Sequence, residues 1–416
     1  MFGLLGKSLS HSFSKKIHES FGSSYQLIES DDLELFFDIT DFCGLNVTIP
    51  YKEDVIQYCD VIDPLVMRTK SCNTIVKKDN TLYAYNTDYT GFLSSLLFHH
   101  ITLKDETIAI IGNGATSRTV QAVAEDLGAK TINIFARHPK NSEYLLDTIS
   151  SYQDTTILVN TTPVGMVPNI HDMFSFELTS LSNLKSVIDV IYNPLNTKLI
   201  LSAKENGLQT MNGLYMLISQ AVKSYELFHH KSIKEKELIS LYRTIKKQKC
   251  NIVFIGMPKS GKSLYSKIYA EKNNRTLYDI DSMFEAKFKM SIHEYFAQNS
   301  EQSFRIEEQK LIQDIASKSG IVISTGGGSI LSKENIINLK INGIIVFIDA
   351  KVSLLEKTGI SNHRPLLNTP NSLQKLYQER HHLYTNAADI IMTKEVLNTT
   401  TNINTLEMLI YEYFGT

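Results

Sequence analysis

The sequence predicts an α/β protein with more than one domain, and three observations carry that prediction. The chain has 416 residues, which at a rough prior of about 150 residues per domain suits two or three domains. Two apolar runs, Thr107–Ile111 and Asn251–Ile255, each lead into a glycine-rich turn and then into a helical pattern. Residues 1 to about 100 alternate strand-like and helical pieces ahead of the first turn. Short β-branched runs of this kind are typical of buried parallel strands.

The composition excludes several classes of protein. Hydrophobic residues make up 43% and charged residues 21%, so the chain is not mainly disordered. A net charge of −2 indicates neither a nucleic-acid partner nor an anionic membrane. No apolar run is long enough to span a membrane or to act as a signal peptide. The four cysteines show no metal-ligand spacing, so we expect reduced thiols and a cytoplasmic protein.

The elements before the first turn form an α/β layer without a phosphate loop. Strand-like pieces cover Gly44–Ile49, Asn73–Lys77 and Leu82–Tyr85. His229–Gln248 is rich in lysine and glutamate with apolar residues at helical spacing, so we expect a terminal helix that runs into a linker. The expected domains are a substrate domain of residues 1–97 with a return segment 205–248, a dinucleotide domain of residues 98–204, and a second nucleotide domain of residues 249–416.

The second glycine-rich turn, Gly256–Ser263, has the spacing Gly-x-x-x-x-Gly-Lys-Ser of a phosphate-binding loop. Backbone N–H groups of such a turn and of the following helix N-terminus bind phosphate oxygens. Lys262 is placed to reach the β- and γ-phosphates, and the Ser263 hydroxyl to bind Mg²⁺. The sequence therefore predicts an ATP and Mg²⁺ site formed by Gly256, Ser260, Gly261, Lys262 and Ser263.

Further motifs follow this loop in order along the chain. They are Tyr278-Asp279-Ile-Asp281, Phe304-Arg305-x-x-Glu308, Ile323-Ser-Thr-Gly326-Gly327-Gly328, Arg364-Pro-Leu-Leu367, and Arg380 with Tyr384 beyond it. Together they resemble shikimate kinase over about residues 250 to 395. The resemblance implies a P-loop kinase domain with a parallel sheet flanked by helices.

The resemblance also implies roles for these residues. Asp281 is expected to contact the shikimate hydroxyl and assist its deprotonation, and Asp279 to support Mg²⁺ through water. Arg364 is expected on a mobile lid near residues 350–368, where it closes over the transferring phosphate and also contacts ATP. The implied catalytic residues include Lys262 as well. The implied contacts to shikimate are Asp281, Arg305, Gly326, Gly327, Gly328 and Arg380.

Some positions depart from the kinase pattern. Lys259, Lys289 and Ser300 stand where the family usually has glycine, Leu264 replaces a threonine, and Lys357 replaces an arginine near the adenine. None of these removes a core catalytic group. We expect them to affect nucleotide affinity and lid behaviour more than the type of reaction.

The first glycine-rich turn, Gly-Asn-Gly-Ala-Thr-Ser over Gly112–Ser117, is part of the dinucleotide fingerprint. The next strand ends in Ala136-Arg137-His138, where an NAD site would carry an acidic residue. An arginine there suits the 2′-phosphate of NADP. The expected NADP(H) contacts in this Rossmann-like domain are Gly112, Gly114, Ala115, Thr116, Ser117 and Arg137.

Several motifs of the first half carry a second resemblance. They are Ser10-His-Ser12-Phe-Ser14, Asn46-Val-Thr48-Ile-Pro50-Tyr-Lys52, Ser71-Cys-Asn73-Thr, Asn86-Thr-Asp88, Asp189-Val-Ile-Tyr192-Asn-Pro194 and Gly213-Leu-x-Met-Leu-x-x-Gln220. Together they resemble shikimate dehydrogenase over about residues 1 to 245. The resemblance implies that Tyr192 contacts the substrate and that Gly213 contacts the cofactor.

The residues of these motifs suit the reduction of a ketone in a polyhydroxylated acid. Lys52 can act as general acid or base, with Asp88 orienting it. The dinucleotide domain supplies the hydride source. The active-site residues should line a cleft between the two domains. Side chains that can hydrogen-bond the substrate are Ser12, Ser14, Thr48, Asn73 and Gln220.

The two halves together predict a bifunctional enzyme of aromatic amino-acid biosynthesis. The first half would reduce 3-dehydroshikimate to shikimate with NADPH, and the second would phosphorylate shikimate with Mg·ATP to shikimate 3-phosphate. One alternative is that only one half is active and the other binds or regulates. Another is that the first half is a quinate/shikimate dehydrogenase that uses NAD.

Overall fold

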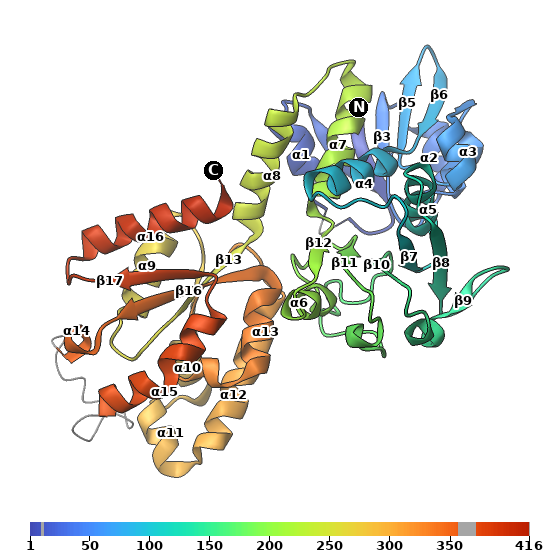
Figure 1. Cartoon of the computed structure of the whole chain (residues 1–416). Helices are drawn as coiled ribbons and strands as arrows, with labels where there is room; N and C mark the ends of the chain where they lie inside the picture. Colours follow the sequence, from blue (N-terminus) through green and yellow to red (C-terminus); the bar gives the residue numbers. More distant parts are fainter. Residues whose placement is uncertain (10–11, 357–371, 416) are drawn as a thin grey trace. The chain divides into compact units, whose positions relative to one another are not determined.

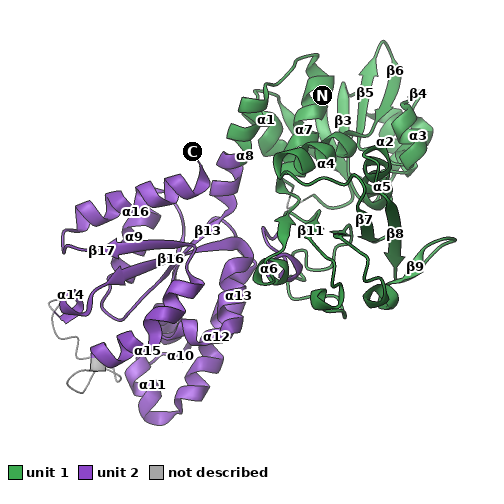
Figure 2. Ribbon diagram, viewed as in Figure 1, with its two compact units in different colours: residues 1–193, 202–242 green, residues 194–201, 243–416 purple. Residues whose placement is uncertain are grey.

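The computed structural model of the chain describes residues 1–9, 12–356 and 372–415. They form two compact units, coloured separately in Figure 2. The first contains Met1–Asn193 and Ser202–Tyr242, and the second contains Pro194–Leu201 and Arg243–Thr416. Among the described residues, no helix combines the length and apolar character that crossing a membrane requires.

The first unit begins with a six-stranded mixed sheet in the order β2-β1-β3-β5-β6-β4 (Figure 1). β1 pairs in parallel with β2 and β3, whereas β5 is antiparallel to both of its neighbours. The strands are β1 (Phe2–Gly6), β2 (Tyr25–Glu29), β3 (Gly44–Val47), β4 (Val61–Ile62), β5 (Thr74–Lys78) and β6 (Thr81–Tyr85). Its helical elements are α1 (Ser14–Ser20), α2 (Leu33–Ile39), η1 (Asp54–Tyr58) and α3 (Pro64–Thr69).

Two longer helices, α4 (Thr87–Phe98) and α7 (Leu214–His229), pack against each other in the first unit (Figure 1). Gly91 of α4 permits this approach, because a Cβ there would lie 2.7 Å from the carbonyl oxygen of Met216. The packing brings α7, from late in the unit, beside α4. This matters for function because α4 begins at the Asn86-Thr-Asp88 motif.

The second sheet of the first unit is parallel throughout, in the order β12-β11-β10-β7-β8-β9. Its central strands β7, β10 and β11 are fully buried, as expected for a parallel sheet with covered faces. The strands are β7 (Thr107–Ile111), β8 (Thr131–Ala136), β9 (Tyr144–Leu145), β10 (Ile157–Asn160), β11 (Ser186–Asp189) and β12 (Gln209–Met211). The accompanying helical elements are α5 (Ala115–Asp126), η2 (Leu146–Ser151), η3 (Leu178–Ser180) and α6 (Lys198–Glu205).

The second unit holds a parallel five-stranded sheet in the order β14-β15-β13-β16-β17. In Figure 1, α9 and α16 lie on one face of this sheet, and α13 and α15 lie on the other. The strands are β13 (Asn251–Ile255), β14 (Leu277–Asp279), β15 (Val322–Ser324), β16 (Gly343–Ala350) and β17 (Ile390–Lys394). The helix α8 (Glu235–Lys249) begins in the first unit and ends in the second. The other helical elements of the second unit are α9 (Lys262–Lys272), α10 (Ile280–Phe288), α11 (Ile292–Gln298), α12 (Glu301–Ala316), η4 (Ser329–Leu331), α13 (Lys333–Asn342), α14 (Val352–Glu356), α15 (Ser372–Ala387) and α16 (Thr399–Phe414).

The second unit also includes a short segment that is distant in sequence, Pro194–Leu201. The backbone N–H of Leu195 donates to Asn342 Oδ1 over 2.9 Å, and that of Asn196 donates to the carbonyl of Ile341 over 2.8 Å. Lys198 forms an ion pair of 3.1 Å with Glu334. These contacts are made to α13 and its final residues.

The predicted α/β architecture is confirmed, with a parallel sheet after each glycine-rich turn. Thr107–Ile111 and Asn251–Ile255 are the strands β7 and β13, with the predicted bounds. Residues 235–248 of the lysine- and glutamate-rich segment belong to α8, but this helix continues to Lys249 and β13 starts at Asn251, so the linker expected after the helix is not present in this described stretch. The two strand predictions hold because each depends on a local apolar run and on the glycine that follows it.

Candidate active sites

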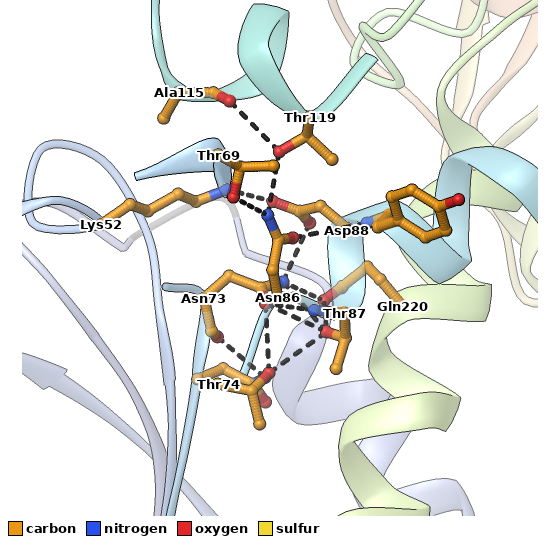
Figure 3. Close-up of polar contacts among 12 residues, drawn as sticks. Lys52, Thr69, Asn73, Thr74, Asn86, Thr87, Asp88, Ala115, Thr119 and Gln220 are labelled. Atoms are coloured by element: carbon orange, nitrogen blue, oxygen red, sulfur yellow. Dashed lines mark hydrogen bonds and ion pairs between the residues drawn. The ribbon is translucent and has the colours of Figure 1, made fainter. Parts of the chain in front are cut away.

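The first candidate site is built around an ion pair between Lys52 and Asp88 (Figure 3). Lys52 follows β3, and Asp88 lies in the first turn of α4. Lys52 Nζ is 2.6 Å from Asp88 Oδ2, and the two side chains are only 14% and 9% exposed. A pair this short and this sheltered is a charge-assisted hydrogen bond that fixes the direction of the ammonium group.

Asn73 holds the same carboxylate from its other side. Its amide nitrogen lies 2.9 Å from Asp88 Oδ1, 3.0 Å from Thr87 Oγ1 and 3.3 Å from Gln220 Oε1. Its side-chain oxygen accepts from the backbone N–H of Thr87 over 2.7 Å. Figure 3 shows these residues converging from the start of β5, the start of α4, and α7. The structure therefore brings together four residues singled out from the sequence, Lys52, Asp88, Asn73 and Gln220.

A second layer of buried polar side chains lies behind Asn73. Thr74 Oγ1 is 3.1 Å from both Thr87 Oγ1 and Ser224 Oγ. Asn46 donates to Ser224 Oγ over 2.7 Å and accepts from the Tyr25 hydroxyl over 2.7 Å. Because these groups satisfy one another, they can be buried without the penalty of an unmade hydrogen bond.

The predicted serine pair lies in a neighbouring part of the first unit. Ser12 Oγ accepts from the backbone N–H of Ser14, the first residue of α1, over 3.2 Å. Phe13 between them packs edge-on against Tyr192, with ring centroids 6.3 Å apart. Burial raises the pKa of Tyr192. In the described part of the chain, the serines and the half-buried Thr48 make no hydrogen bond to the Lys52–Asp88 pair.

The dinucleotide turn between β7 and α5 is shaped for a close ligand. Gly112 has φ +108°, and a Cβ there would come 2.6 Å from Thr161 Oγ1. Gly114 is the N-cap of α5, and a Cβ on it would meet no heavy atom within 4 Å. The turn therefore packs tightly against the protein at Gly112 and leaves free space at Gly114, beside the N-terminus of α5. Free space at a helix N-terminus fits a bound phosphate. Thr116 and the buried Ser117 belong to α5 itself.

The other residues predicted for the dinucleotide follow two further strands of the same sheet, β8 and β12. Arg137 is exposed just after β8, where a 2′-phosphate could reach it. The loop beyond it is tied to the turn, because Asn113 Nδ2 donates to the carbonyl of His138 over 3.1 Å. Gly213 is needed for a close approach, since a Cβ there would collide with the carbonyl of Val190. These features fit NADP(H).

Arg118 connects the dinucleotide helix α5 to the end of α3. Its Nε donates to the carbonyl of Thr69 over 2.6 Å, and its Nη2 lies 2.5 Å from Glu53 Oε1. Asn86 Nδ2 lies 3.0 Å from Thr119 Oγ1 on the same helix (Figure 3). Asn86 is two residues before Asp88, so its bond to α5 connects the helix that follows the dinucleotide turn to the segment that carries the ion pair.

The second candidate site lies at the carboxyl ends of β13, β14 and β15. The phosphate loop has positive φ at Gly256 (+149°) and Gly261 (+99°), and α9 starts at Lys262. Lys262 Nζ donates to the carbonyl of Met257 over 3.2 Å. Ser263 Oγ is 3.4 Å from Ser324 Oγ at the end of β15. A lysine and a hydroxyl so placed fit a nucleotide phosphate and Mg²⁺.

The glycine turn Gly326–Gly328 lies directly against the phosphate loop. A Cβ on Gly327 would be 3.2 Å from Pro258 of that loop. A Cβ on Gly326 would be 2.9 Å from Asp281 Oδ1 and 2.9 Å from Glu308 Oε1. Gly326 therefore lies against the Asp281 carboxylate, and the adjacent Gly327 lies against the phosphate loop. A side chain at either position would crowd these groups.

Two arginines meet this glycine turn. Gly328 lies beneath the guanidinium of Arg305, which forms ion pairs of 2.9 Å with Glu308 and 3.1 Å with Glu301. Arg380 donates to the carbonyl of Gly327 over 3.1 Å. Asp279 caps α10 by accepting from the backbone N–H of Ser282 over 3.0 Å. Its other carboxylate oxygen can still serve a metal-bound water.

Comparisons with known proteins show which proteins the first half of the chain is similar to. Residues 4–75 match the model of the shikimate dehydrogenase substrate binding domain. The chain is 34% identical over 260 residues to the NADP(+) shikimate dehydrogenase of Clostridium beijerinckii, covering 58% of this chain and 96% of the relative. The crystal structure of shikimate dehydrogenase 1 from Peptoclostridium difficile is similar with 31% identity and a TM-score of 0.54, covering 59% of this chain and 97% of that one.

The chain belongs to the shikimate dehydrogenase family. The shikimate dehydrogenase of Thermus thermophilus, solved in complex with NADP(H) and shikimate, is also similar, with 25% identity, a TM-score of 0.52, and coverage of 58% of this chain and 98% of that one. Residues 258–408 match the model of shikimate kinase. A shikimate dehydrogenase and a shikimate kinase are therefore joined in one chain.

Some expected kinase residues lie outside the described residues. Arg364, Lys357 and most of the lid expected near residues 350–368 fall there. Two departures from the kinase pattern have a backbone explanation, because Lys259 (φ +69°) and Lys289 (φ +54°) have left-handed conformations in which glycine is usual. Ser300 has a local role instead, since its side chain caps α12.

Several residues of the dehydrogenase and kinase sites were missed in the sequence. Thr74 and Thr87 stand inside quoted motifs, and Arg118 follows the glycine turn directly, so each had a positional signal. Ser329, which no motif included, donates a 2.6 Å hydrogen bond to Glu308, a residue of the Phe304-Arg305-x-x-Glu308 motif. Asn46 and Ser224 are 178 positions apart, and their pairing left no local signal.

Proposed function

We propose that the first unit reduces 3-dehydroshikimate to shikimate and that the kinase domain phosphorylates the 3-hydroxyl of shikimate. The proposal includes three domains: a substrate-binding domain of residues 1–97 with the return segment 205–248, an NADP-binding domain of residues 98–204, and a kinase domain of residues 249–416. The observation that carries the first activity is the Lys52–Asp88 pair, held by Asn73. The second activity is supported by the contact of the phosphate loop with the Gly326–Gly328 turn.

The reduction needs a proton donor at the ketone oxygen. NADPH, when bound at the β7–α5 turn, supplies the hydride. Lys52 donates a proton to the carbonyl oxygen as that carbon is reduced, and Asp88 orients the ammonium. Asn73 and Gln220 offer amide groups beside this pair. The remaining substrate contacts that we propose are Ser12, Ser14, Thr48 and Tyr192.

The cofactor preference rests on Arg137. A guanidinium after β8 can pair with a 2′-phosphate, whereas an NAD site would carry a carboxylate there. Changing Arg137 to alanine should raise KM for NADPH about tenfold or more and leave KM for NADH nearly unchanged. Lys130→Ala, an exposed lysine before β8, is the matched control. An equal rise of KM for NADPH and for NADH in Arg137→Ala would contradict the assignment of Arg137 to the 2′-phosphate.

The phosphorylation needs a base, charge stabilisation and a carboxylate clamp. Asp281 accepts the proton of the shikimate hydroxyl, while Lys262 and Arg364 stabilise the charge of the transferring phosphate. Ser263 and, through water, Asp279 hold Mg²⁺, which when bound neutralises the phosphate charge. Arg305 and Arg380 bind the substrate carboxylate with Gly326–Gly328.

A coupled assay on the full chain tests both activities. 3-Dehydroshikimate, NADPH and Mg·ATP are supplied, NADPH loss is followed by absorbance, and shikimate 3-phosphate is quantified. Both signals should appear, Lys52→Ala should abolish only the first, and Lys262→Ala only the second. If shikimate accumulates and no shikimate 3-phosphate forms, the kinase proposal is contradicted. A first half that prefers quinate and NAD would overturn the proposed reduction.

The proposed partners are small molecules, and the proposed location is the cytoplasm. The four cysteines are free thiols, which supports a reducing compartment.

A further inference from the structure

Lys394 ends β17 beside the phosphate loop. Because β13, β16 and β17 are parallel neighbours, their carboxyl ends meet at one edge of the sheet. Lys394 is only 7% exposed, and its Nζ lies 3.4 Å from the carbonyl oxygen of Ser260. The same Nζ is 3.7 Å from the position that a Cβ on Gly261 would take. The ammonium group thus lies against the backbone that is expected to bind phosphate.

No carboxylate of the described residues forms an ion pair with Lys394. Burial lowers the pKa of Lys394, and no acidic group in the described part of the chain opposes that effect. A buried ammonium without a carboxylate is destabilised relative to one in water. A polyanion bound to the adjoining loop would supply the missing negative charge.

The surroundings hold Lys394 in this place. Its Nζ is 5.6 Å from the centroid of the buried Tyr265 ring. Asn402 fixes Tyr265 by donating to its hydroxyl over 2.9 Å and binds the carbonyl of Val396 over 2.9 Å. The segment after β17 and the aromatic ring are therefore tied together, which directs the lysine stem toward the loop.

We propose that Lys394 is a second cationic residue of the nucleotide site, placed behind the phosphate loop, and that it strengthens nucleotide binding according to the charge of the phosphates. The inference rests on the proposed kinase function. Lys262 belongs to the loop itself, whereas Lys394 comes from the far strand of the sheet. The ligand it serves is a nucleoside di- or triphosphate.

Calorimetric titration of the full chain with adenosine, AMP and ADP tests this proposal. Lys394→Met keeps the stem and removes the charge, so ADP should bind about tenfold more weakly while adenosine binds nearly as before. The loss of affinity for AMP should lie between the losses for adenosine and ADP. Lys394→Arg should restore ADP affinity to within about threefold of the original chain. Lys272→Met, which removes a lysine at the other end of α9, should leave all three affinities unchanged.

The outcomes separate this inference from the kinase proposal. Equal losses for adenosine and ADP would show a structural role and overturn the inference, as would an unchanged ADP affinity. If Lys394→Met does not fold, Lys394→Gln with a salt titration replaces it, and an ADP salt dependence equal to that of the original chain would be contrary evidence. An original chain that binds no ADP would defeat the kinase proposal and this inference together. ADP binding without shikimate phosphorylation would defeat the kinase proposal alone.

Discussion

The side-chain amide of Asn73 donates to Asp88 Oδ1 over 2.9 Å, and this bond fixes the carboxylate that pairs with Lys52. Lys52 Nζ lies 2.6 Å from the other oxygen, Oδ2. Asp88 is therefore held from two sides before any substrate binds. A carboxylate held in this way can orient a proton donor without first rearranging.

Asp88→Asn is expected to lower kcat of the reductase by about 100-fold or more, because Lys52 loses its orienting charge. The shikimate kinase activity of the same chain should be unchanged. Steady-state kinetics with NADPH and 3-dehydroshikimate measure the first effect. Asp41→Asn removes the carboxylate of an exposed 2.8 Å pair with Lys77 and is the matched control. A reductase that keeps its kcat in Asp88→Asn would contradict the assignment of this pair.

Gly328→Ala is expected to raise the KM for shikimate about tenfold, because the new Cβ would collide with the Arg305 guanidinium. The KM for ATP should change little. The reductase activity of the same protein is an internal control for folding of the first unit. A KM for shikimate that stays constant would show that Arg305 does not need its present position.

His18 should make the first unit less stable in acid. It is fully buried and stacks on Tyr25 with ring centroids 4.1 Å apart, and burial lowers its pKa from 6.5 to about 3. Between these values the unfolded chain binds the proton and the folded chain does not, so stability falls as pH falls through this window.

The measurement is the free energy of unfolding in denaturant at several pH values. His18→Phe, which keeps an aromatic ring on Tyr25, should reduce the slope by up to about 1.4 kcal/mol per pH unit between pH 6 and 4. Above pH 7 the two slopes should agree, because His18 is neutral in both states. Identical slopes in the acid window would refute the role of His18.

Lys289→Gly is expected to stabilise the kinase domain by up to about 1 kcal/mol, because Lys289 ends α10 with φ +54°. Lys267→Gly, in the middle of α9, should instead destabilise it by about 1 kcal/mol. Thermal or denaturant unfolding measures both. Destabilisation by Lys289→Gly would show that the lysine side chain contributes more than its backbone conformation costs.

The structure brings many of the predicted site residues into two clusters, one in each candidate site. Lys52, Asp88, Asn73 and Gln220 contact one another, and Gly326–Gly328 meets Asp281, Arg305 and Arg380. Each group combines motifs from distant parts of the chain, and the resemblance to known families supplied their grouping. Ser224 and Lys394 lie in no motif, and Asn46 lies in the Asn46–Lys52 motif without an assigned role, so neither spacing nor resemblance pointed to their supporting contacts.

The sequence by itself determined the two phosphate turns, since an apolar strand, a glycine turn and a helix start are all encoded within a few neighbouring residues. It also determined the chemistry available to each half, through Lys52 and Asp88 in one and Lys262 and Asp281 in the other. Only the tertiary structure decided which polar groups are buried together. Asn46 of β3 meets Ser224 because α7 also packs against β5, the neighbour of β3, and Lys394 meets Ser260 because β17 lies in register beside β16. Such contacts depend on how sheets and helices pack over long sequence separations, and no local pattern encodes them.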